Sequence, residues 1–345
     1  MPDNIPIVDF AQASKLPEIV GKDLLQACAD WGFFYIKNHP IPQADVEGIF
    51  ELEKRFFAQP LEVKNTVPYF PPKNAGYKPR TFAGIDNTKS DPREAFSINK
   101  WPTAAHTHAS VLPPVLHEAR PQIEAFQKKV QALNRRLLEL IAHALGLPRD
   151  QFTACHSPDQ ENFDNFDLMH YPPISKTEET PADGTVYRIS PHTDWGSLTY
   201  LFQQDVGGLE VRPPKYTSPS LSLGAEEWIP APVHNTMILV NIGDMLEFWT
   251  AGALKSTWHR VVPNTRLHGD TGGIDRYAFA YFVHPNRDTV LRPIEGMKRE
   301  GWVPRYRGIG RTAAEHIAAR IRGEDRIVSM QIDADRTART VPMEA

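Results

Sequence analysis

Two histidines and one aspartate stand at spacings that could build a metal site. His192 and Asp194 are separated by one residue, and residues two apart in a β-strand point to the same face. An imidazole and a carboxylate on one face could bind one metal ion. His259 follows in a run of residues typical of a buried strand, where a polar side chain needs a partner.

Two histidines and one carboxylate on one side of a metal, with the other side open, form the facial triad of non-haem Fe(II) enzymes. Each part of this pattern also has an ordinary structural interpretation. His192 and Asp194 could form a turn capped by the aspartate, and His259 could be a hydrogen-bonded core histidine. The occurrence of all three in strand-like surroundings favours the metal site.

Arg276 opens an apolar, strand-like run that ends at Phe282. If its guanidinium faces inward, the planar fork suits a carboxylate held by two hydrogen bonds. A dicarboxylate that chelates iron through a 2-oxo acid end would place its distal carboxylate there. The alternative is an arginine at a strand start that points into solvent.

The surrounding pattern predicts helices mainly in the first half of the chain and short strands mainly in the second. Apolar residues at helical spacing predict helices over 22–30, 44–58, 115–145 and 312–321. Short apolar or β-branched segments alternate with turn residues from residue 162 onward, which is typical of a sandwich or jelly roll. Strands are predicted at 5–10, 31–36, 94–98, 167–171, 185–189, 197–202, 209–212, 227–231, 237–242, 257–262 and 277–283.

The predicted fold is mainly β with flanking helices, and we expect residues 1–345 to form one unit. A mostly helical N-terminal region over 1–150 would pack on a jelly-roll core over 160–300. A C-terminal helix and tail would occupy 301–345. The core would carry the catalytic site.

Composition excludes several classes of protein. The 345 residues carry a formal net charge of −4, so nucleic acid is not an expected partner. Two cysteines cannot build a disulfide scaffold, no signal-peptide pattern opens the chain, and no apolar run is long enough to span a membrane. We therefore expect a cytoplasmic protein that binds a small molecule and needs no obligate protein partner.

The chain resembles the isopenicillin N synthase-like family of Fe(II)/2-oxoglutarate-dependent oxygenases over about residues 5–321. The segments that carry the resemblance are 5–10, 32–39, 169–173, 192–199, 205–211, 240–244 and 255–261. The resemblance implies a double-stranded β-helix, or jelly-roll, core. It also implies that His192, Asp194 and His259 bind Fe(II), and that Arg276 binds the distal carboxylate of 2-oxoglutarate.

Tyr171 lies where this family often adds a hydroxyl contact to the cosubstrate, although it could equally be a core aromatic. One departure concerns the arginine motif. The family's usual Arg-x-Ser is Arg276-Tyr277-Ala278 here, so the serine hydroxyl that helps to hold the carboxylate is missing. Its absence should weaken cosubstrate binding without abolishing it, because the arginine carries the charge.

The sequence indicates the substrate-binding residues less clearly than the metal ligands. Trp195 follows the candidate metal aspartate and could wall the pocket. Asp167 could bind a cationic or hydrogen-bond-donating substrate, because it carries a charge beside the Tyr-Pro-Pro segment. Packing in the core or at the surface is the alternative for all the substrate candidates, which are Trp195, Asp167, Phe166, Tyr77, Arg80, Phe202 and Phe248.

The resemblance implies a dioxygenase that hydroxylates or desaturates a small organic molecule with O2 and releases succinate and CO2. Ascorbate is a possible reductant. Two variants stay open: an iron-dependent oxidase of the same fold that does not use 2-oxoglutarate, and an ethylene-forming enzyme. A non-catalytic jelly-roll binding protein is a further alternative, which the intact triad disfavours.

Overall fold

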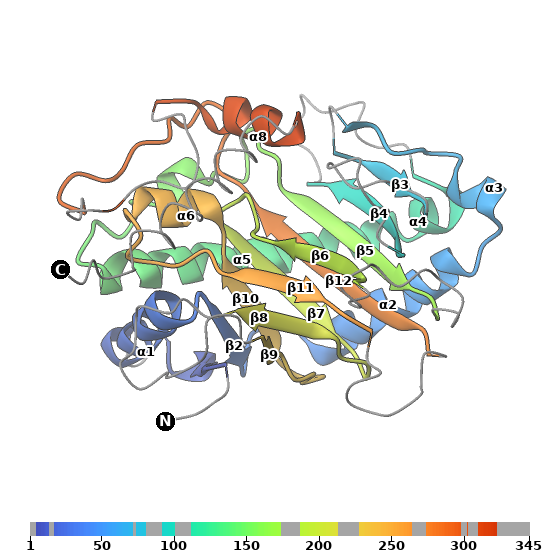
Figure 1. The fold of residues 1–345 in the computed structure, drawn as a ribbon, viewed down its shortest axis with the longest axis horizontal. Coiled ribbons are helices and arrows are strands. Elements are labelled where there is room, and N and C mark those ends of the chain that lie inside the picture. The colour runs from blue at the N-terminus through green and yellow to red at the C-terminus, as the bar shows by residue number, and fades with distance from the viewer. Residues whose placement is uncertain are drawn as a thin grey trace, which may run out of the picture.

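In the computed structural model, the described part of the chain comprises residues 5–13, 17–71, 74–80, 92–100, 112–173, 187–212, 228–263, 274–297, 302 and 310–322. Two β-sheets and a layer of helices make up this part (Figure 1). No helix in it is long and apolar enough to cross a membrane.

The larger sheet contains eight strands among the described residues. Its neighbours are antiparallel except β1 and β2, which pair in parallel. The order across the sheet is β1 (Ile7–Asp9), β2 (Phe33–Lys37), β10 (Ile238–Ile242), β7 (Leu198–Gln203), β12 (Arg276–Val283), β5 (Asn165–Tyr171), β4 (Glu94–Asn99) and β3 (Gly76–Lys78).

The smaller sheet has four strands among the described residues, and it covers one face of the larger sheet. Its order is β6 (Ile189–His192), β11 (Trp258–Val261), β8 (Leu209–Arg212) and β9 (Ile229–Pro230). Val211 and Val261 of this sheet join Tyr171 and Ala278 of the larger sheet in one buried cluster. The two sheets form the predicted jelly-roll core, and we call the face turned toward the smaller sheet the inner face.

Helices cover the other, outer face of the larger sheet. The ring of Phe126, in α5 (Arg120–Ala144), packs on Phe166, Phe202 and Phe279 from β5, β7 and β12. The remaining helical elements are η1 (Phe10–Gln12), α1 (Pro17–Asp30), α2 (Gln43–Phe57), α3 (Leu61–Lys64), α4 (Pro114–Glu118), η3 (Thr153–Cys155), α6 (Asp244–Trp249) and α8 (Ala313–Ile321).

The structure corrects three expectations about elements. The predicted helix over 115–145 is two helices, because α4 ends before Ala119 and α5 restarts with Pro121 in its first turn, where a missing N–H costs little. Of the predicted strand 185–189 only Ile189 is in a strand, and residues 185 and 186 lie outside the described residues. The short helix α6 was not predicted.

Candidate active site

His192 and His259 lie directly opposite each other in neighbouring strands. β6 pairs with β11 in antiparallel register, and these two residues are partners in it. Their ring centroids are 4.2 Å apart. His192 is the last residue of β6 and His259 the second of β11, so both imidazoles reach the same end of the smaller sheet.

Asp194 joins the two histidines from the loop that follows β6 rather than from the strand. Its Oδ1 lies 3.8 Å from Nε2 of His192 and 3.6 Å from Nε2 of His259. The three donor atoms all lie within 4.8 Å of one another. The two side chains converge as predicted, but strand spacing is not the reason, because β6 ends at His192 and Asp194 lies beyond it.

The loop that carries Asp194 is held by the start of α6 and by Gly243, which precedes it. The backbone N–H of Asp244 donates to the Asp194 carbonyl at 2.8 Å. Gly243 packs so closely here that a Cβ on it would lie 2.2 Å from the carbonyl oxygen of Gly196. This close contact explains why residue 243 is a glycine. It also fixes the backbone at Asp194 and so the direction of its side chain.

Each of the three side chains has one group already bonded within the protein and one left for a ligand. Nδ1 of His192 lies 2.8 Å from the Ser190 carbonyl, and Nδ1 of His259 lies 3.1 Å from the Thr257 carbonyl. Since a carbonyl only accepts, both Nδ1 atoms carry hydrogen and both Nε2 atoms are free to coordinate. Oδ2 of Asp194 accepts from Thr199 Oγ1 at 2.6 Å and from Asn241 Nδ2 at 2.8 Å.

The electrostatics of the three side chains suit metal binding. Desolvation lowers the pKa of His192 to about 4. Burial opposes the charge on His259 and on Asp194, but their mutual attraction outweighs it: the pKa of His259 is raised and that of the Asp194 carboxyl is held well below its usual range. A metal ion would take the place of the proton that Asp194 favours on His259, so two imidazole nitrogens and one carboxylate on one side fit the donor set of a non-haem Fe(II) site.

Arg276 supplies a second charged group on the inner face. It is 4% exposed, its Nη2 donates to Oε1 of Gln203 at 3.0 Å, and its Cζ lies 4.5 Å from the ring centroid of Tyr171. Nε and Nη1 have no hydrogen-bond partner among the residues that the structure describes. Two unpaired donors on one buried guanidinium leave it able to bind a ligand carboxylate through charge-assisted hydrogen bonds, as a 2-oxo dicarboxylate would present.

Comparison with known proteins agrees with this site. Residues 5–116 match the family model of the non-haem dioxygenase in morphine synthesis N-terminal domain, and residues 162–285 match that of the 2OG-Fe(II) oxygenase superfamily. A relative named 2-oxoglutarate-dependent dioxygenase frbA, from Dothideomycetidae sp. (strain 11243), is 33% identical over 305 residues, covering 83% of this chain and 86% of its own.

The chain belongs to the Fe(II)/2-oxoglutarate oxygenase superfamily. It is a 2-oxoglutarate-dependent dioxygenase with Fe(II) and 2-oxoglutarate as cofactor and cosubstrate. Proline hydroxylase buaE of Petromyces alliaceus is 32% identical over 314 residues, covering 88% of this chain and 94% of that protein. A solved Neurospora crassa protein in complex with alpha-KG and thymine superimposes with a TM-score of 0.76 at 26% identity, covering 93% of this chain and 97% of that one.

The structure does not bring all the predicted substrate residues of this oxygenase together. Four of them, Phe166, Phe202, Tyr77 and Phe248, belong to the outer-face core that packs against the helices. Trp195 also packs against that core, with the Arg320 guanidinium 5.3 Å from its ring centroid. Arg80 is exposed.

Asp167 differs from these residues, because it lies on the inner face of β5. Residues alternate along a strand, and Met169 and Tyr171, two and four positions further on, are both in the inner cluster. Asp167 is 6% exposed and its Oδ2 lies 3.4 Å from Nζ of Lys78. It is the predicted substrate residue that shares a face with Arg276 and Tyr171.

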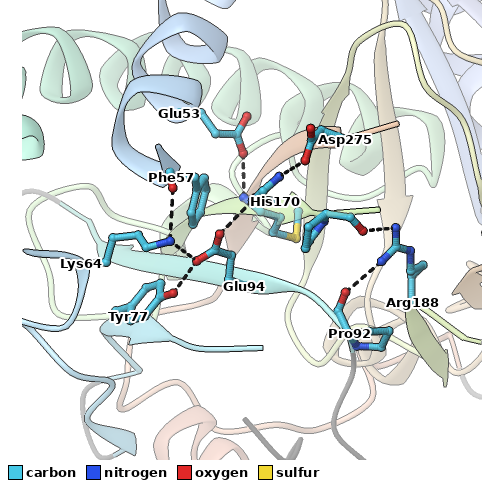
Figure 2. Close-up of polar contacts among 11 residues, drawn as sticks. Glu53, Phe57, Lys64, Tyr77, Pro92, Glu94, His170, Arg188 and Asp275 are labelled. Atoms are coloured by element: carbon cyan, nitrogen blue, oxygen red, sulfur yellow. Dashed lines mark hydrogen bonds and ion pairs between the residues drawn. The ribbon is translucent and has the colours of Figure 1, made fainter. Parts of the chain in front are cut away.

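Sequence reasoning missed a buried polar network behind this face of the oxygenase (Figure 2). Glu94 of β4 accepts from Lys64 Nζ at 2.7 Å and from the Tyr77 hydroxyl, and its other oxygen lies 2.8 Å from Nδ1 of His170. His170 reaches Asp275, the residue before Arg276, at 2.7 Å through Nε2. The network ties α3, β3, β4 and β5 to the start of the strand that carries the arginine.

Glu53 of α2 was also missed. It is fully buried, and its Oε1 accepts from the backbone N–H of Met169 at 2.7 Å (Figure 2). Burial raises its pKa well above the usual value. A carboxyl within the otherwise apolar face of a predicted helix was the available signal for a buried polar contact.

Proposed function

We propose that His192, Asp194 and His259 hold Fe(II) through Nε2, Oδ1 and Nε2, and that Arg276 holds the distal carboxylate of 2-oxoglutarate. The enzyme then oxidises a C–H bond of a small organic substrate by hydroxylation or desaturation. The observation that carries this proposal is the convergence of three donor atoms within 4.8 Å, each of them left over after its side chain has been anchored elsewhere.

The role of the protein is to orient and to bind. The Ser190 and Thr257 carbonyls fix the tautomer and direction of the two imidazoles, and Thr199 with Asn241 confines Asp194 to one free oxygen. Fe(II) with 2-oxoglutarate supplies the activation of O2, coupled to loss of CO2 and formation of succinate. The apolar inner cluster limits the access of water to that chemistry.

We infer a small nitrogen-containing substrate from the named relatives, one of which is called a proline hydroxylase while another was solved with thymine. The N-terminal region and the core are proposed to be one unit, which the pairing of β2 with β10 and of β4 with β5 supports. A cytoplasmic location without an obligate partner is proposed as well, and the two free cysteines, Cys28 and Cys155, support it.

The proposal is tested by incubating the protein with Fe(II), ascorbate, O2 and 2-oxoglutarate and measuring succinate. We expect succinate above the protein-free background, and more of it with a true substrate. His192→Ala should abolish both succinate release and Fe(II) binding. The control His117→Ala, at an exposed position in α4, should change neither.

The same assay separates the alternatives. Consumption of O2 with substrate but without 2-oxoglutarate would identify an oxidase, and ethylene in the headspace would identify the ethylene-forming variant. A chain that binds small molecules equally well with and without Fe(II), and releases no succinate, would be a binding protein, and the proposed function would be wrong.

A further inference from the structure

On the inner face of the larger sheet, residues that are paired in the register of neighbouring strands form rows that run across the strands. Thr199, whose hydroxyl bonds the candidate iron ligand Asp194, lies in a row with Phe282 and Asn165. Two residues along the strands, the next row contains Leu201 of β7, Ala280 of β12, Asp167 of β5 and Ser97 of β4. Asp167 therefore lies two strands from Leu201, about 10 Å at a strand spacing of roughly 4.8 Å.

The following row leads to the other end of the site. It contains Gln203, Ala278, Met169, Ala95 and Lys78, and beyond it lie Arg276 and Tyr171. Asp167 and Ser97 thus stand between the row of the candidate iron site and the row of Arg276, displaced sideways toward β4. A substrate beside an iron-bound 2-oxoglutarate would lie over this part of the sheet.

The sheet carries small side chains there, and we call this area the floor. Ala278 and Ala280 of β12, Ala95 and Ser97 of β4, and Gly76 of β3 extend no further than Cβ or one hydroxyl from the sheet. Such short side chains fill less of the space between the two sheets than longer ones would. Asp167 and Lys78 are charged side chains at its edge, and Arg93 adds a positive charge near Lys78. Nζ of Lys78 also lies 4.6 Å from the ring centroid of Tyr69.

Polar atoms that face this floor lack partners. Oδ1 of Asp167 and Oγ of Ser97 have no hydrogen-bond partner among the residues described, although these residues are only 6% and 1% exposed. A buried polar atom without a partner costs free energy, so such atoms usually mark a missing ligand or water. They occur side by side, since Ser97 and Asp167 are paired in the register.

We propose that Asp167, Lys78 and Ser97 bind the polar group of the substrate, and that this group has an N–H or ammonium donor beside an oxygen acceptor. The free Oδ1 of Asp167 accepts from the nitrogen, and the ammonium of Lys78 or the hydroxyl of Ser97 donates to the oxygen. The Lys78–Asp167 pair has no net charge, so it matches a group of no net charge. Lactams, amides and amino acids carry this pattern. The inference rests on the proposed function, because it assigns the substrate of that site.

The test compares matched compounds on the Fe(II)- and 2-oxoglutarate-loaded protein without O2, by calorimetric titration. The lactam 2-pyrrolidinone is paired with its N-methyl derivative and with γ-butyrolactone, and proline is paired with cyclopentanecarboxylate. We expect at least one N–H member to bind about tenfold or more tightly than its partners, because a site built for a hydrogen bond rejects the analogue that lacks it. Equal binding or no binding of both members, in every pair, overturns the inference.

Variants then test whether Lys78 and Asp167 cause the preference for N–H compounds. Lys78→Met combined with Asp167→Leu removes both charges without leaving one buried and unpaired. It should reduce the preference for N–H compounds to less than about threefold, while the affinity for 2-oxoglutarate stays unchanged, which reports an intact fold. Asp9→Asn, which disrupts a half-exposed ion pair with Lys37 at the opposite edge of the sheet, is the matched control and should keep the preference. A preference that survives in the double variant overturns the assignment.

Asp167→Asn distinguishes an ammonium ion from an amide N–H as the donor that Asp167 binds. The affinity for proline should fall about tenfold or more if an ammonium ion is bound. The affinity for a lactam should fall only a few-fold, because the amide oxygen of asparagine still accepts a hydrogen bond. The failure of the proposed function looks different: the wild-type protein would then bind neither Fe(II) nor 2-oxoglutarate.

Discussion

The amide of Asn241 in β10 donates a 2.8 Å hydrogen bond to Oδ2 of Asp194, which lies 47 residues earlier in the chain. Together with Thr199, it leaves Oδ1 as the carboxylate oxygen that faces the two histidines. The geometry of the candidate iron site therefore depends on the larger sheet as well as on the strands that carry the histidines.

Replacing Asn241 by alanine should weaken metal binding, because it frees the Asp194 carboxylate to rotate. Loss of such an outer partner typically costs about 10–100-fold in metal affinity. Titration with Fe(II) under anaerobic conditions measures the change. Asn38→Ala, which removes a surface contact to Asp9, is the control, and equal Fe(II) affinity in the two variants would contradict the role given to Asn241.

Arg276→Lys should raise the KM for 2-oxoglutarate about tenfold or more, because an ammonium group keeps the charge but not the fork of two donors. Affinity for Fe(II) should be unchanged. Arg287→Lys, in a half-exposed ion pair with Glu161, is the matched control. An unchanged KM in Arg276→Lys would show that the cosubstrate carboxylate is held elsewhere.

Ala278→Ser should tighten 2-oxoglutarate binding by about tenfold to a hundredfold. The side chain of residue 278 lies on the same face as Arg276, and a hydrogen bond to a charged group contributes about 1.5–3 kcal/mol. Equilibrium titration measures the Kd. Ala280→Ser, two residues further along the same face, should have a smaller effect. A weaker affinity in Ala278→Ser would mean that the added hydroxyl finds no acceptor there.

Glu53→Gln should stabilise the protein near neutral pH. The pKa of Glu53 is raised by burial, so the folded carboxyl stays protonated where the unfolded one is ionised, and this difference costs stability increasingly as pH rises above about 4.5. Glutamine keeps an oxygen for the Met169 N–H without that cost. Urea unfolding at pH 4 and pH 8 should show a larger gain at pH 8, and a loss at both values would contradict the assignment.

Glu94→Gln should have the opposite effect. Burial opposes ionisation of Glu94, but His170, Lys64 and Tyr77 outweigh it and lower its pKa. The stability from this carboxylate is therefore present above about pH 4.5 and is lost as pH falls through the lower folded value. Breaking a buried pair from one side costs about 3–5 kcal/mol. Urea unfolding should show that loss at pH 7 and a smaller one at pH 3, and Glu51→Gln in a surface pair is the control.

The sequence was sufficient to predict the jelly-roll core and the convergence of the three candidate iron ligands. The residue types, the short strand patterns and the family resemblance of the surrounding segments carry that information together. The path of the loop at Asp194 was not predictable, since it depends on contacts with Gly243 and Asp244 that only the folded chain makes.

The substrate residues were harder to predict because they depend on strand parity. Phe166 and Asp167 are adjacent, yet they lie on opposite faces of β5. Only the pairing of Tyr171 with Arg276 shows that the odd-numbered residues of β5 are the ones that face the site. Aromatic residues were therefore chosen by type; the register places Phe166, Phe202 and Tyr77 in the core that packs against the helices, and Phe248 belongs to α6 itself.

The place of β2 between β1 and β10 has a consequence for synthesis of the chain. Phe34 pairs with Val240, so the strand at residues 33–37 is complete about 200 residues before its partner leaves the ribosome, which takes roughly 10–40 s at 5–20 residues per second. During that interval its apolar side chains and unpaired backbone groups are exposed. We therefore expect the yield of folded enzyme to depend on chaperones that shield β2 until β10 is made.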